Sequence, residues 1–340
     1  MKACLFEAQD QDKVRCILCS HRCLIKEGRR GICQVRQNQQ GVLQTLVYGR
    51  LIARHVDPIE KKPLFHLLPG SLSYSIATVG CNFKCRFCQN ADIAQMPQDR
   101  QGQIMGSGCT PEEVVADAMS HLCQSIAYTY TEPTVYFEFA LDTARIAQAR
   151  GLKNVFVTNG YMSAEALEMV APHLDAANVD LKAFSDTFYK NYCSARLEPV
   201  KETLRGMKAR GILVEVTTLL IPGLNDDPRE LRALADFLVH DLGPETPWHI
   251  SRFHPTYRLT DRPPTPVKTL HTAREIGLQA GLHYVYMGNM PGENGESTHC
   301  HHCGGLLIER WGFSVRRNKI RNGQCPECHT PVYGIGMSAG

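Results

Sequence analysis

Short apolar stretches and longer segments of helical periodicity alternate along the chain between residues 72 and 286. Among the segments of helical periodicity, Thr110 followed by Pro111 predicts a helix start, because threonine caps helices and proline is tolerated at the first helical position. A further helix is expected over 163–171. The apolar stretches predict strands over 73–79, 125–129, 153–158, 176–182, 212–219, 247–252 and 283–287. This alternation predicts a parallel α/β architecture and leaves open whether the sheet is open or forms a closed or partial barrel.

The segments outside this region have a different character. Residues 42–48 and 51–56 are expected to be extended, and 57–63 is expected to be a turn bounded by prolines. A chain of 340 residues suggests one main domain with appendages. We therefore expect a cysteine-rich metal-binding segment over 1–68, a core over 69–290, and a small C-terminal domain over 291–340, joined through a linker at 291–295.

Composition narrows the class of protein only slightly. Hydrophobic residues make up 43% of the chain, which is enough for a packed core and excludes a disordered chain. The net charge of +3 argues neither for nor against a nucleic-acid partner. No apolar signal core and no apolar run long enough to span a bilayer are visible, so we expect a cytoplasmic protein with no membrane partner.

Fifteen cysteines are the most unusual feature of the composition. In a reducing compartment, clustered cysteines bind metals more often than they form disulfides. Eleven of them fall into three clusters. The other four are expected to be buried packing residues, with Cys193 a candidate for a second role: Cys4, Cys109, Cys123 and Cys193.

The middle cluster follows directly after the predicted strand 73–79. Cys81, Cys85 and Cys88 have the spacing C-x3-C-x2-C. Three thiolates on one loop can hold three irons of a [4Fe–4S] cluster and leave the fourth iron open to another ligand. A structural zinc site would normally have four protein ligands.

The cysteine triplet, with Phe87 just before its third member, resembles the motif of the radical S-adenosylmethionine (SAM) superfamily. Residues 80–90 together with 57–66 are similar to the radical SAM enzymes of the AmmeMemoRadiSam system, which are relatives of pyruvate formate-lyase activating enzyme. The resemblance implies a partial (βα)6 radical SAM barrel. It also implies a [4Fe–4S] cluster on Cys81, Cys85 and Cys88, whose open iron binds SAM. In this family the segment around Lys61 and Lys62 borders the cluster, so these lysines are either solvated charges or residues facing a substrate or partner.

Further motifs follow the predicted strands, where parallel α/β proteins place their ligands. The resemblance implies a SAM-binding role for Glu132, although Tyr130 and Thr131 stand where relatives often have two glycines. It implies the same role for Asp180 and Lys182, which share one face of a strand. Asn159 lies in a polar strand tip suited to reach the cofactor, Thr217 or Thr218 is expected to face it, and His254 matches a histidine near SAM in activating enzymes. Each has a structural alternative. Glu132 could be a solvated carboxylate at a helix start, Asp180 and Lys182 could be an ion pair that stabilises the fold, and His254 could be a structural histidine.

The N-terminal cluster comprises four cysteines within eighteen residues: Cys16, Cys19, Cys23 and Cys33. A set of four thiols suits either a zinc staple or an auxiliary iron–sulfur cluster. We favour zinc here, because so short a segment has little core of its own.

The C-terminal cluster consists of two C-x2-C pairs separated by twenty-one residues: Cys300, Cys303, Cys325 and Cys328. Paired knuckles predict a zinc ribbon with four cysteine ligands, although nearby histidines could compete (His299, His301, His302 and His329). The basic loop at 316–321 could contact nucleic acid. A structural or protein-docking role is favoured, because no stacking aromatics are interleaved among its charges.

The resulting hypothesis is a radical SAM enzyme that reductively cleaves SAM to a 5′-deoxyadenosyl radical for hydrogen abstraction from an unknown substrate, which could be a protein, an RNA or a small molecule. Activation of a glycyl-radical enzyme is one alternative. A non-catalytic zinc-binding adaptor for protein or RNA is another. The enzyme hypothesis implies a reductase such as flavodoxin or ferredoxin, and possible partner proteins from the AmmeMemoRadiSam system.

Overall fold

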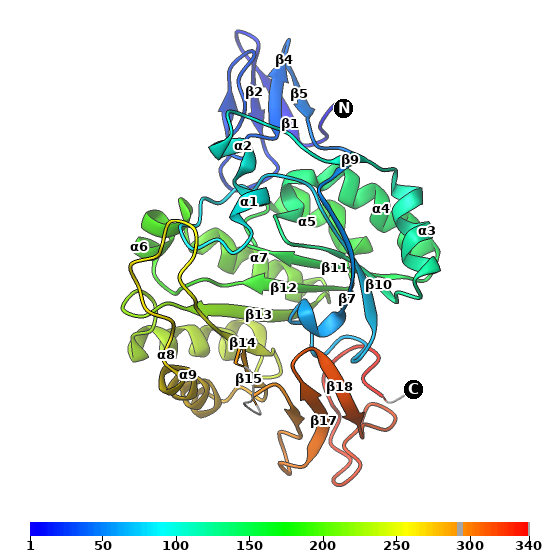
Figure 1. Cartoon of the computed structure of the whole chain (residues 1–340), viewed down its shortest axis with the longest axis vertical. Coiled ribbons are helices and arrows are strands. Elements are labelled where there is room, and N and C mark those ends of the chain that lie inside the picture. Colours follow the sequence, from blue (N-terminus) through cyan, green and yellow to red (C-terminus); the bar gives the residue numbers. More distant parts are fainter. Residues whose placement is uncertain (291–294, 339–340) are drawn as a thin grey trace.

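A mixed α/β fold with a largely parallel sheet occupies the centre of the computed structural model, which describes residues 1–290 and 295–338 (Figure 1). Eight strands form this sheet in the order β15-β14-β13-β12-β11-β10-β8-β7. Only β7 runs antiparallel to its neighbour within the sheet. The strands are β7 (Ala53–Pro58), β8 (Leu72–Ala77), β10 (Ser125–Tyr128), β11 (Lys153–Thr158), β12 (Ala176–Asp180), β13 (Leu213–Leu220), β14 (Trp248–Arg252) and β15 (Val285–Gly288).

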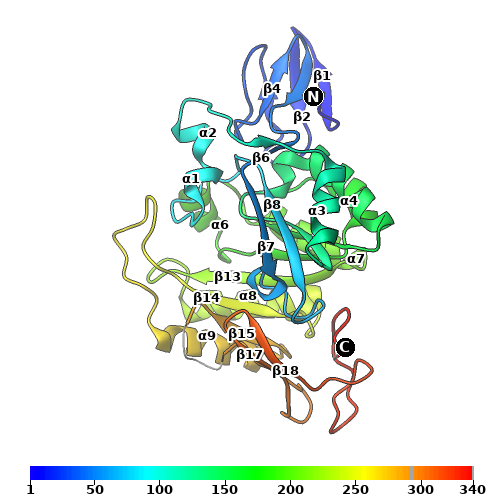
Figure 2. The same ribbon diagram turned by 45° about the vertical axis from the view of Figure 1, so that its right-hand side comes forward.

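Helices connect the parallel strands and lie along the outside of the sheet (Figures 1 and 2). The helices between the strands are α3 (Pro111–Ser120), α4 (Phe137–Ala149), α5 (Ala164–Val170), α7 (Glu198–Ala209), α8 (Pro228–Phe237) and α9 (Val267–Ala280). Shorter helices are α1 (Ala91–Ala94), α2 (Met96–Asp99) and α6 (Asp186–Phe188). The predicted parallel architecture is therefore confirmed, with each expected strand present to within three residues at either end.

Helix starts follow the capping signals in the sequence. The Thr110 hydroxyl accepts a hydrogen bond from the backbone N–H of Glu113, and the Glu113 carboxylate accepts one from the Thr110 N–H. This reciprocal pair satisfies two backbone donors that a helix start leaves unpaired. Ser163 caps α5 with a single bond, because its hydroxyl accepts from the backbone N–H of Ala166.

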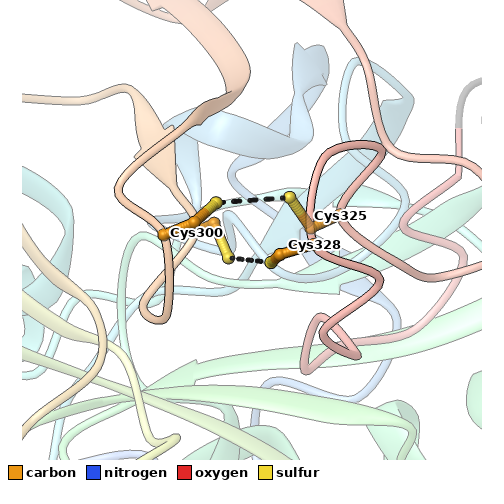
Figure 3. Close-up of side chains that lie close together, drawn as sticks. Cys300, Cys325 and Cys328 are labelled. Carbon is orange, nitrogen blue, oxygen red and sulfur yellow. Dashed lines mark hydrogen bonds between the residues drawn. The ribbon is translucent and has the colours of Figure 1, made fainter.

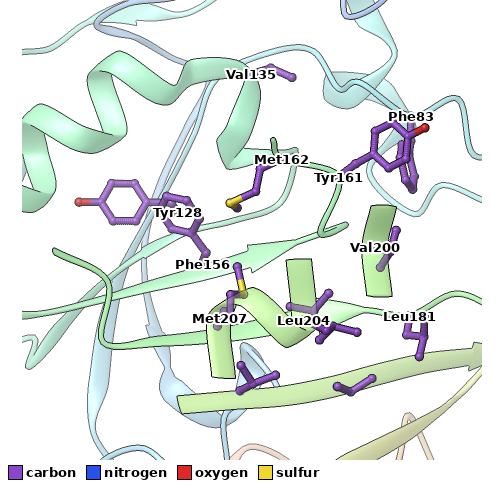
Figure 4. Packing of buried hydrophobic residues seen from close by; sticks show 14 of the residues in the cluster. Phe83, Tyr128, Val135, Phe156, Tyr161, Met162, Leu181, Val200, Leu204 and Met207 are labelled. Atoms are coloured by element: carbon purple, nitrogen blue, oxygen red, sulfur yellow. The ribbon is translucent and has the colours of Figure 1, made fainter. Parts of the chain in front are cut away.

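The main core lies between the sheet and its helices. Figure 4 shows Leu204 and Met207 of α7 beside Phe156 of β11, with Tyr128 of β10 close by. All four side chains are fully buried. Parallel strands covered on both faces read as continuous apolar runs, which explains why the strands were visible in the sequence.

The edge strand β7 corrects one expectation. Residues 57–63 were expected to be a turn, but Asp57 and Pro58 still belong to β7, and the 3-10 turn η1 (Ile59–Lys61) follows. Proline can end a strand at the sheet edge, because no further strand needs its missing N–H. The chain therefore enters the main sheet before the expected boundary at 68/69, and that boundary stays a prediction.

The N-terminal strands form a projection at one end of the molecule (Figures 1 and 2). One sheet contains β1 (Phe6–Gln9), β2 (Lys13–Cys16) and β3 (Leu24–Ile25), and a hairpin joins β4 (Arg36–Gln39) to β5 (Val42–Thr45). A two-stranded ladder pairs β6 (Arg50–Leu51) with β9 (Ser107–Gly108).

The C-terminal segment lies at the opposite end of the molecule (Figure 1). Its strands are β16 (Thr298–His299), β17 (Leu306–Trp311) and β18 (Ser314–Asn318), and it has a small hydrophobic cluster of its own. Most of the linker expected at 291–295 lies outside the described residues. Over 1–290 and 295–338, no helix combines the length and the apolar character that a membrane crossing requires.

Candidate functional site

A cavity of about 480 Å³ opens at the carboxyl ends of the parallel strands, and we call it the main cavity. This is the edge at which α/β folds bind ligands, because the loops after the strands converge there. Among the residues that line it are seven site residues expected from the sequence: Cys81, Cys85, Cys88, Glu132, Asn159, Asp180 and Lys182. The structure therefore brings together side chains spread over a hundred residues of sequence.

The three cysteines of the motif contribute one wall of the main cavity. The backbone N–H of Phe83 lies 3.3 Å from the Cys81 sulfur, and the side-chain amide of Asn159 lies 3.8 Å from it. Donors of this kind stabilise thiolate ligands. A contact with Cys193 lowers the pKa of Cys85, although burial opposes the shift. Cys193 itself is fully buried and is absent from the described residues that line the cavity, so the motif presents three thiols to this space.

Glu132 is buried beside these thiols, at the start of the 3-10 turn η2 (Pro133–Tyr136). One carboxylate oxygen accepts bonds from the Thr134 N–H, the Thr134 hydroxyl and the Thr158 hydroxyl, at 2.6 to 3.0 Å. The other oxygen accepts one bond, from the Asn159 N–H at 2.8 Å. Burial raises the pKa of Glu132. The second oxygen keeps capacity for a further donor, such as an ammonium group in the cavity.

Asp180 and Lys182 form an ion pair that also lines the main cavity. The Lys182 ammonium lies 2.9 Å from an Asp180 carboxylate oxygen. Burial lowers the pKa of Lys182, but the charges of Asp180 and of the Cys85 thiol outweigh burial and hold it well above its ordinary value. Lys182 is therefore a fixed positive charge beside the cysteine loop.

Tyr130 has a backbone conformation that glycine adopts more easily. Its φ is +63°, and it stands at the first of the two positions where relatives often have glycine. Such a conformation costs on the order of 1 kcal/mol for a bulky residue. Three contacts offset this cost: Asn90 donates to the Tyr130 carbonyl at 2.7 Å, the Tyr130 hydroxyl donates to Asp57, and the Lys62 ammonium lies 4.5 Å from the ring centre.

Lys62 is a residue of the main cavity that local sequence did not distinguish from a solvated charge. Its side chain is 1% exposed, and its ammonium lies 2.7 Å from Asp57. Burial lowers the pKa of Lys62 to about 8. Lys61 also lines the cavity and bonds the other oxygen of Asp57 at 2.8 Å, but its side chain is 43% exposed. The sequence signal for these lysines was the resemblance of residues 57–66 to a family segment that borders the cluster.

Two other expectations concern the fifth and sixth parallel strands. Thr217 lines the main cavity, whereas Thr218 is buried and accepts a bond from the Trp248 indole. His254 is exposed, and it is absent from the described residues that line the cavity. His249 of β14 lines it instead, with its ring held by the buried Glu215 at 2.6 Å.

A second cavity lies under the N-terminal strands, and we call it the N-terminal thiol cavity. Its walls include all four cysteines of the N-terminal cluster together with His21, Asn82 and Arg36 (Cys16, Cys19, Cys23 and Cys33). Arg36 is 1% exposed and makes two bonds to the Glu138 carboxylate, at 3.0 and 2.5 Å. The four thiols thus meet in one place, as the sequence predicted.

The C-terminal cysteines form a compact group (Figure 3). The sulfurs of Cys300 and Cys328 are 3.6 Å apart, and those of Cys303 and Cys325 are 3.7 Å apart. All four sulfurs lie within 4.8 Å of one another. These distances could hold one metal ion in a tetrahedral arrangement.

The remaining cysteines only partly follow expectation. Cys109, Cys123 and Cys193 are buried, but Cys4 is exposed, so its predicted burial is wrong. Cys4 lies at the margin of the N-terminal sheet, and its backbone N–H bonds Glu138 at 3.0 Å.

Comparisons with known proteins agree with this geometry. The profile of the Radical SAM superfamily matches residues 75–238. An uncharacterized protein of Methanocaldococcus jannaschii is 49% identical over 315 residues, which are 93% of this chain and 93% of that protein. The pyruvate formate-lyase-activating enzyme of Clostridium pasteurianum is 22% identical over 165 residues, which are 47% of this chain and 66% of that enzyme.

A solved structure supports the same fold. The crystal structure of Streptococcus suis SuiB bound to precursor peptide SuiA superposes with a TM-score of 0.51 over 68% of this chain and 51% of that chain. The sequence identity is 13%, so the likeness concerns the fold alone. The superfamily profile and the relatives above show that the chain belongs to the radical SAM superfamily and is related to pyruvate formate-lyase activating enzymes.

Proposed function

We propose that this protein is a radical SAM enzyme that holds a [4Fe–4S] cluster through Cys81, Cys85 and Cys88. The observation that carries the proposal is the set of three thiols on the wall of a cavity that also contains Glu132, Asp180 and Lys182. Three thiolates suit a cubane with one open iron, and the superfamily uses that iron for SAM. When bound, such a cluster supplies the electron that breaks a sulfur–carbon bond of SAM, giving methionine and a 5′-deoxyadenosyl radical.

The residues around the thiols fit the charged ends of SAM. The free capacity of the Glu132 carboxylate suits the methionyl ammonium, and Lys182 suits the methionyl carboxylate, because opposite charges attract strongly in a site with little water. Asp180 is 38% exposed on its side chain and retains an oxygen for a ribose hydroxyl. Asn159 links the two sides of the cavity, since its amide bonds Asn82 at 2.7 Å.

The shape of the sheet supports the same proposal. Seven parallel strands follow one another in sequence order, and we propose that they curve as a partial barrel around the main cavity. Such an enclosure excludes water from a reactive radical and holds the substrate hydrogen next to it. Phe313 and Glu296 of the C-terminal segment also line the cavity, so this segment stands where a substrate would enter.

The relatives suggest a polypeptide substrate. A pyruvate formate-lyase-activating enzyme and a putative glycyl-radical enzyme activating enzyme are similar to parts of this chain, so abstraction of hydrogen from a glycine of a partner protein is the favoured reaction. The motif around Cys81 further supports a place in the AmmeMemoRadiSam system, with its protein components as partners. An electron donor of the flavodoxin or ferredoxin class would reduce the cluster.

The C-terminal cysteines support a separate structural metal. We propose that they hold one zinc ion, because four sulfurs within 4.8 Å of one another match the tetrahedral ligand set of a zinc ribbon. Clustered cysteines that bind metals suit a reducing compartment such as the cytoplasm.

The test is SAM cleavage by anaerobically purified protein. Wild-type protein reduced with dithionite should release 5′-deoxyadenosine from SAM, measured by chromatography, and Cys85→Ala should abolish the release. Cys123→Ala is the matched control, because Cys123 is equally buried but lies outside the main cavity. Iron-loaded wild-type protein that never cleaves SAM, or a Cys85→Ala variant that still cleaves it, would contradict the proposal.

A further inference from the structure

The four thiols of the N-terminal thiol cavity face a common space that is separate from the main cavity. Cys16, Cys19, Cys23 and Cys33 come from β2, from the turn after it and from the loop before β4. They nevertheless line one cavity, together with the apolar side chains of Leu18, Ile25 and Val135. An apolar wall around several thiols is typical of a metal site that is shielded from solvent.

The spacing of these thiols does not match a zinc ion. A zinc–sulfur bond of about 2.3 Å places tetrahedral sulfur ligands about 3.8 Å apart. The C-terminal cysteines meet this requirement, with pairs at 3.6 and 3.7 Å and all four sulfurs within 4.8 Å. Among the residues that the structure describes, no three of the N-terminal cysteines meet the same limit. The same is true of Cys81, Cys85 and Cys88. By this measure neither the N-terminal thiols nor the motif thiols are gathered closely enough to bind one tetrahedral ion.

A buried arginine adds an independent indication of the ligand. Arg36 forms part of the cavity wall, and its Nε–H has no hydrogen-bond partner within the described chain. Its two terminal nitrogens are already bonded to Glu138. A buried donor without a partner is costly, so an acceptor in the cavity is expected. The sulfides and thiolates of an iron–sulfur cluster are acceptors that could meet this need.

We propose that the N-terminal cysteines bind a second iron–sulfur cubane instead of zinc: Cys16, Cys19, Cys23 and Cys33. Four cysteines provide one thiolate for each iron, so this cluster has no open position for SAM. It differs in that respect from the cluster proposed on Cys81, Cys85 and Cys88.

The second cluster would lie next to the cysteine motif. His21, in the wall of the N-terminal thiol cavity, bonds the Asn82 carbonyl at 2.8 Å, and Asn82 follows Cys81 directly. The Cys33 carbonyl would lie 3.3 Å from a Cβ at Gly80, whose φ of +101° and lack of a side chain permit this close approach. One turn of backbone and one imidazole ring therefore separate the two groups of thiols. This position suits one-electron exchange between the two clusters. The exchange rests on the proposed function, whereas binding of the second cluster does not.

The decisive test removes the motif cysteines and leaves the N-terminal set intact. A chain with Cys81→Ala, Cys85→Ala and Cys88→Ala, purified anaerobically, should retain about four irons per chain. It should also contain one zinc and show the Mössbauer doublet of a [4Fe–4S] cluster. A triple variant with no iron and two zinc ions would overturn the inference. If the triple variant retains its iron but the wild-type protein does not cleave SAM, the proposed function is refuted and the second cluster is not.

A second variant tests the assignment from the other side. Replacement of Cys19 and Cys33 by alanine in the otherwise wild-type chain should lower iron from about eight to about four per chain and leave zinc unchanged. Cys4→Ala is the matched control, since Cys4 lies in the same segment but outside the cavity, and it should keep all the iron. Unchanged iron in the double variant would contradict the inference. If this variant does not fold, the triple variant still decides between the two metals.

Discussion

Two four-cysteine regions stand at opposite ends of this molecule and hold their thiols differently. The C-terminal sulfurs pair at 3.6 and 3.7 Å around a point, whereas the N-terminal sulfurs line a cavity and, among the residues that the structure describes, do not form such a compact group. Both regions read as similar metal sites in the sequence, because both contain closely spaced cysteines. The distance between sulfurs, which local sequence does not reveal, is what separates a site for one ion from a site for a cluster.

A buried arginine accompanies each region, and here too the two ends differ. Arg36 makes two short bonds to Glu138 of α4. Arg310 of β17 lies 3.5 Å from Glu60, and it binds the Phe65 carbonyl at 2.8 Å and the Thr298 hydroxyl at 2.6 Å instead. The N-terminal end is therefore fixed to the core by a tight ion pair, and the C-terminal end mainly by bonds from one guanidinium to neutral oxygens.

The largest contrast should come from removing one C-terminal ligand. Cys325→Ala should eliminate zinc from the chain and unfold residues 298–338, because structural zinc supplies most of the folding free energy of such small units. Metal analysis and hydrogen exchange measure both effects. Iron should stay unchanged, and a loss of iron in this variant would show that the two ends are not independent.

The next effect concerns the tight ion pair at the N-terminal end. Glu138→Gln should lower the free energy of unfolding by about 3–5 kcal/mol, because it leaves the buried Arg36 charge uncompensated. Urea denaturation under anaerobic conditions measures the loss. Glu165→Gln is the control, since its bond to Arg22 is exposed and should contribute at most about 1 kcal/mol. Equal losses for both variants would contradict the importance of burial.

A smaller loss is expected at the C-terminal end. Glu60→Gln should cost about 1–3 kcal/mol, because the longer contact to Arg310 contributes less than a bidentate pair. Denaturation of this variant beside Glu138→Gln gives the comparison directly. A loss as large as that of Glu138→Gln would remove the difference between the two ends.

The pH dependence of these two losses should also differ. Burial raises the pKa of Glu60 above 4.5, so the folded protein binds its proton more tightly than the unfolded chain. The stability contributed by Glu60 is then fully present below pH 4.5 and declines as pH rises through the folded value. For Glu138, burial is outweighed by Arg36, and its pKa is lowered, so its contribution is constant above pH 4.5. From pH 5 to pH 8 the stability lost in Glu60→Gln should become smaller, whereas the stability lost in Glu138→Gln should stay constant. A Glu138→Gln loss that shrinks while the Glu60→Gln loss stays constant would contradict these two pKa directions.

The smallest effect on stability is expected at Phe313. This side chain is 52% exposed at the tip of the β17–β18 hairpin but lines the main cavity. Phe313→Ala should change the free energy of unfolding by less than about 0.5 kcal/mol and leave both metal contents unchanged. Phe253→Ala, at a fully buried position, is the contrasting control and should cost about 3–5 kcal/mol. A large loss at Phe313 would mean that the hairpin tip is part of the packed core.

The strands and helix starts could be read from the sequence because their signals are local. Thr110 and Ser163 cap helices within three residues of themselves, and buried parallel strands are continuously apolar. The end of the edge strand β7 was missed, because Pro58 looks like a turn signal in the sequence. Only the sheet shows that it lies on an edge strand, where a proline is tolerated.

The three cysteines of the main cavity were equally visible, since they lie within eight residues of one another. Buried charges were not. Arg36 and Glu138 are 102 positions apart in the chain, and Lys62 is buried only because Asp57 and Tyr130 close over it. No local pattern distinguishes these residues from solvated charges. The contribution of Phe313 to the main cavity is likewise a product of tertiary packing.

Because the N-terminal segment docks on the loop after β11, its thiols are left open while the chain is being made. Ser20 bonds the Tyr161 carbonyl and Arg22 pairs with Glu165, so neither contact exists until those residues leave the ribosome. Synthesis from Cys33 to Glu165 takes roughly 7–26 s at about 5–20 residues per second. During that interval the nascent thiols are accessible to oxidants and to free metal ions. The cluster that we propose at this end would therefore compete with any zinc that reaches the thiols during this interval.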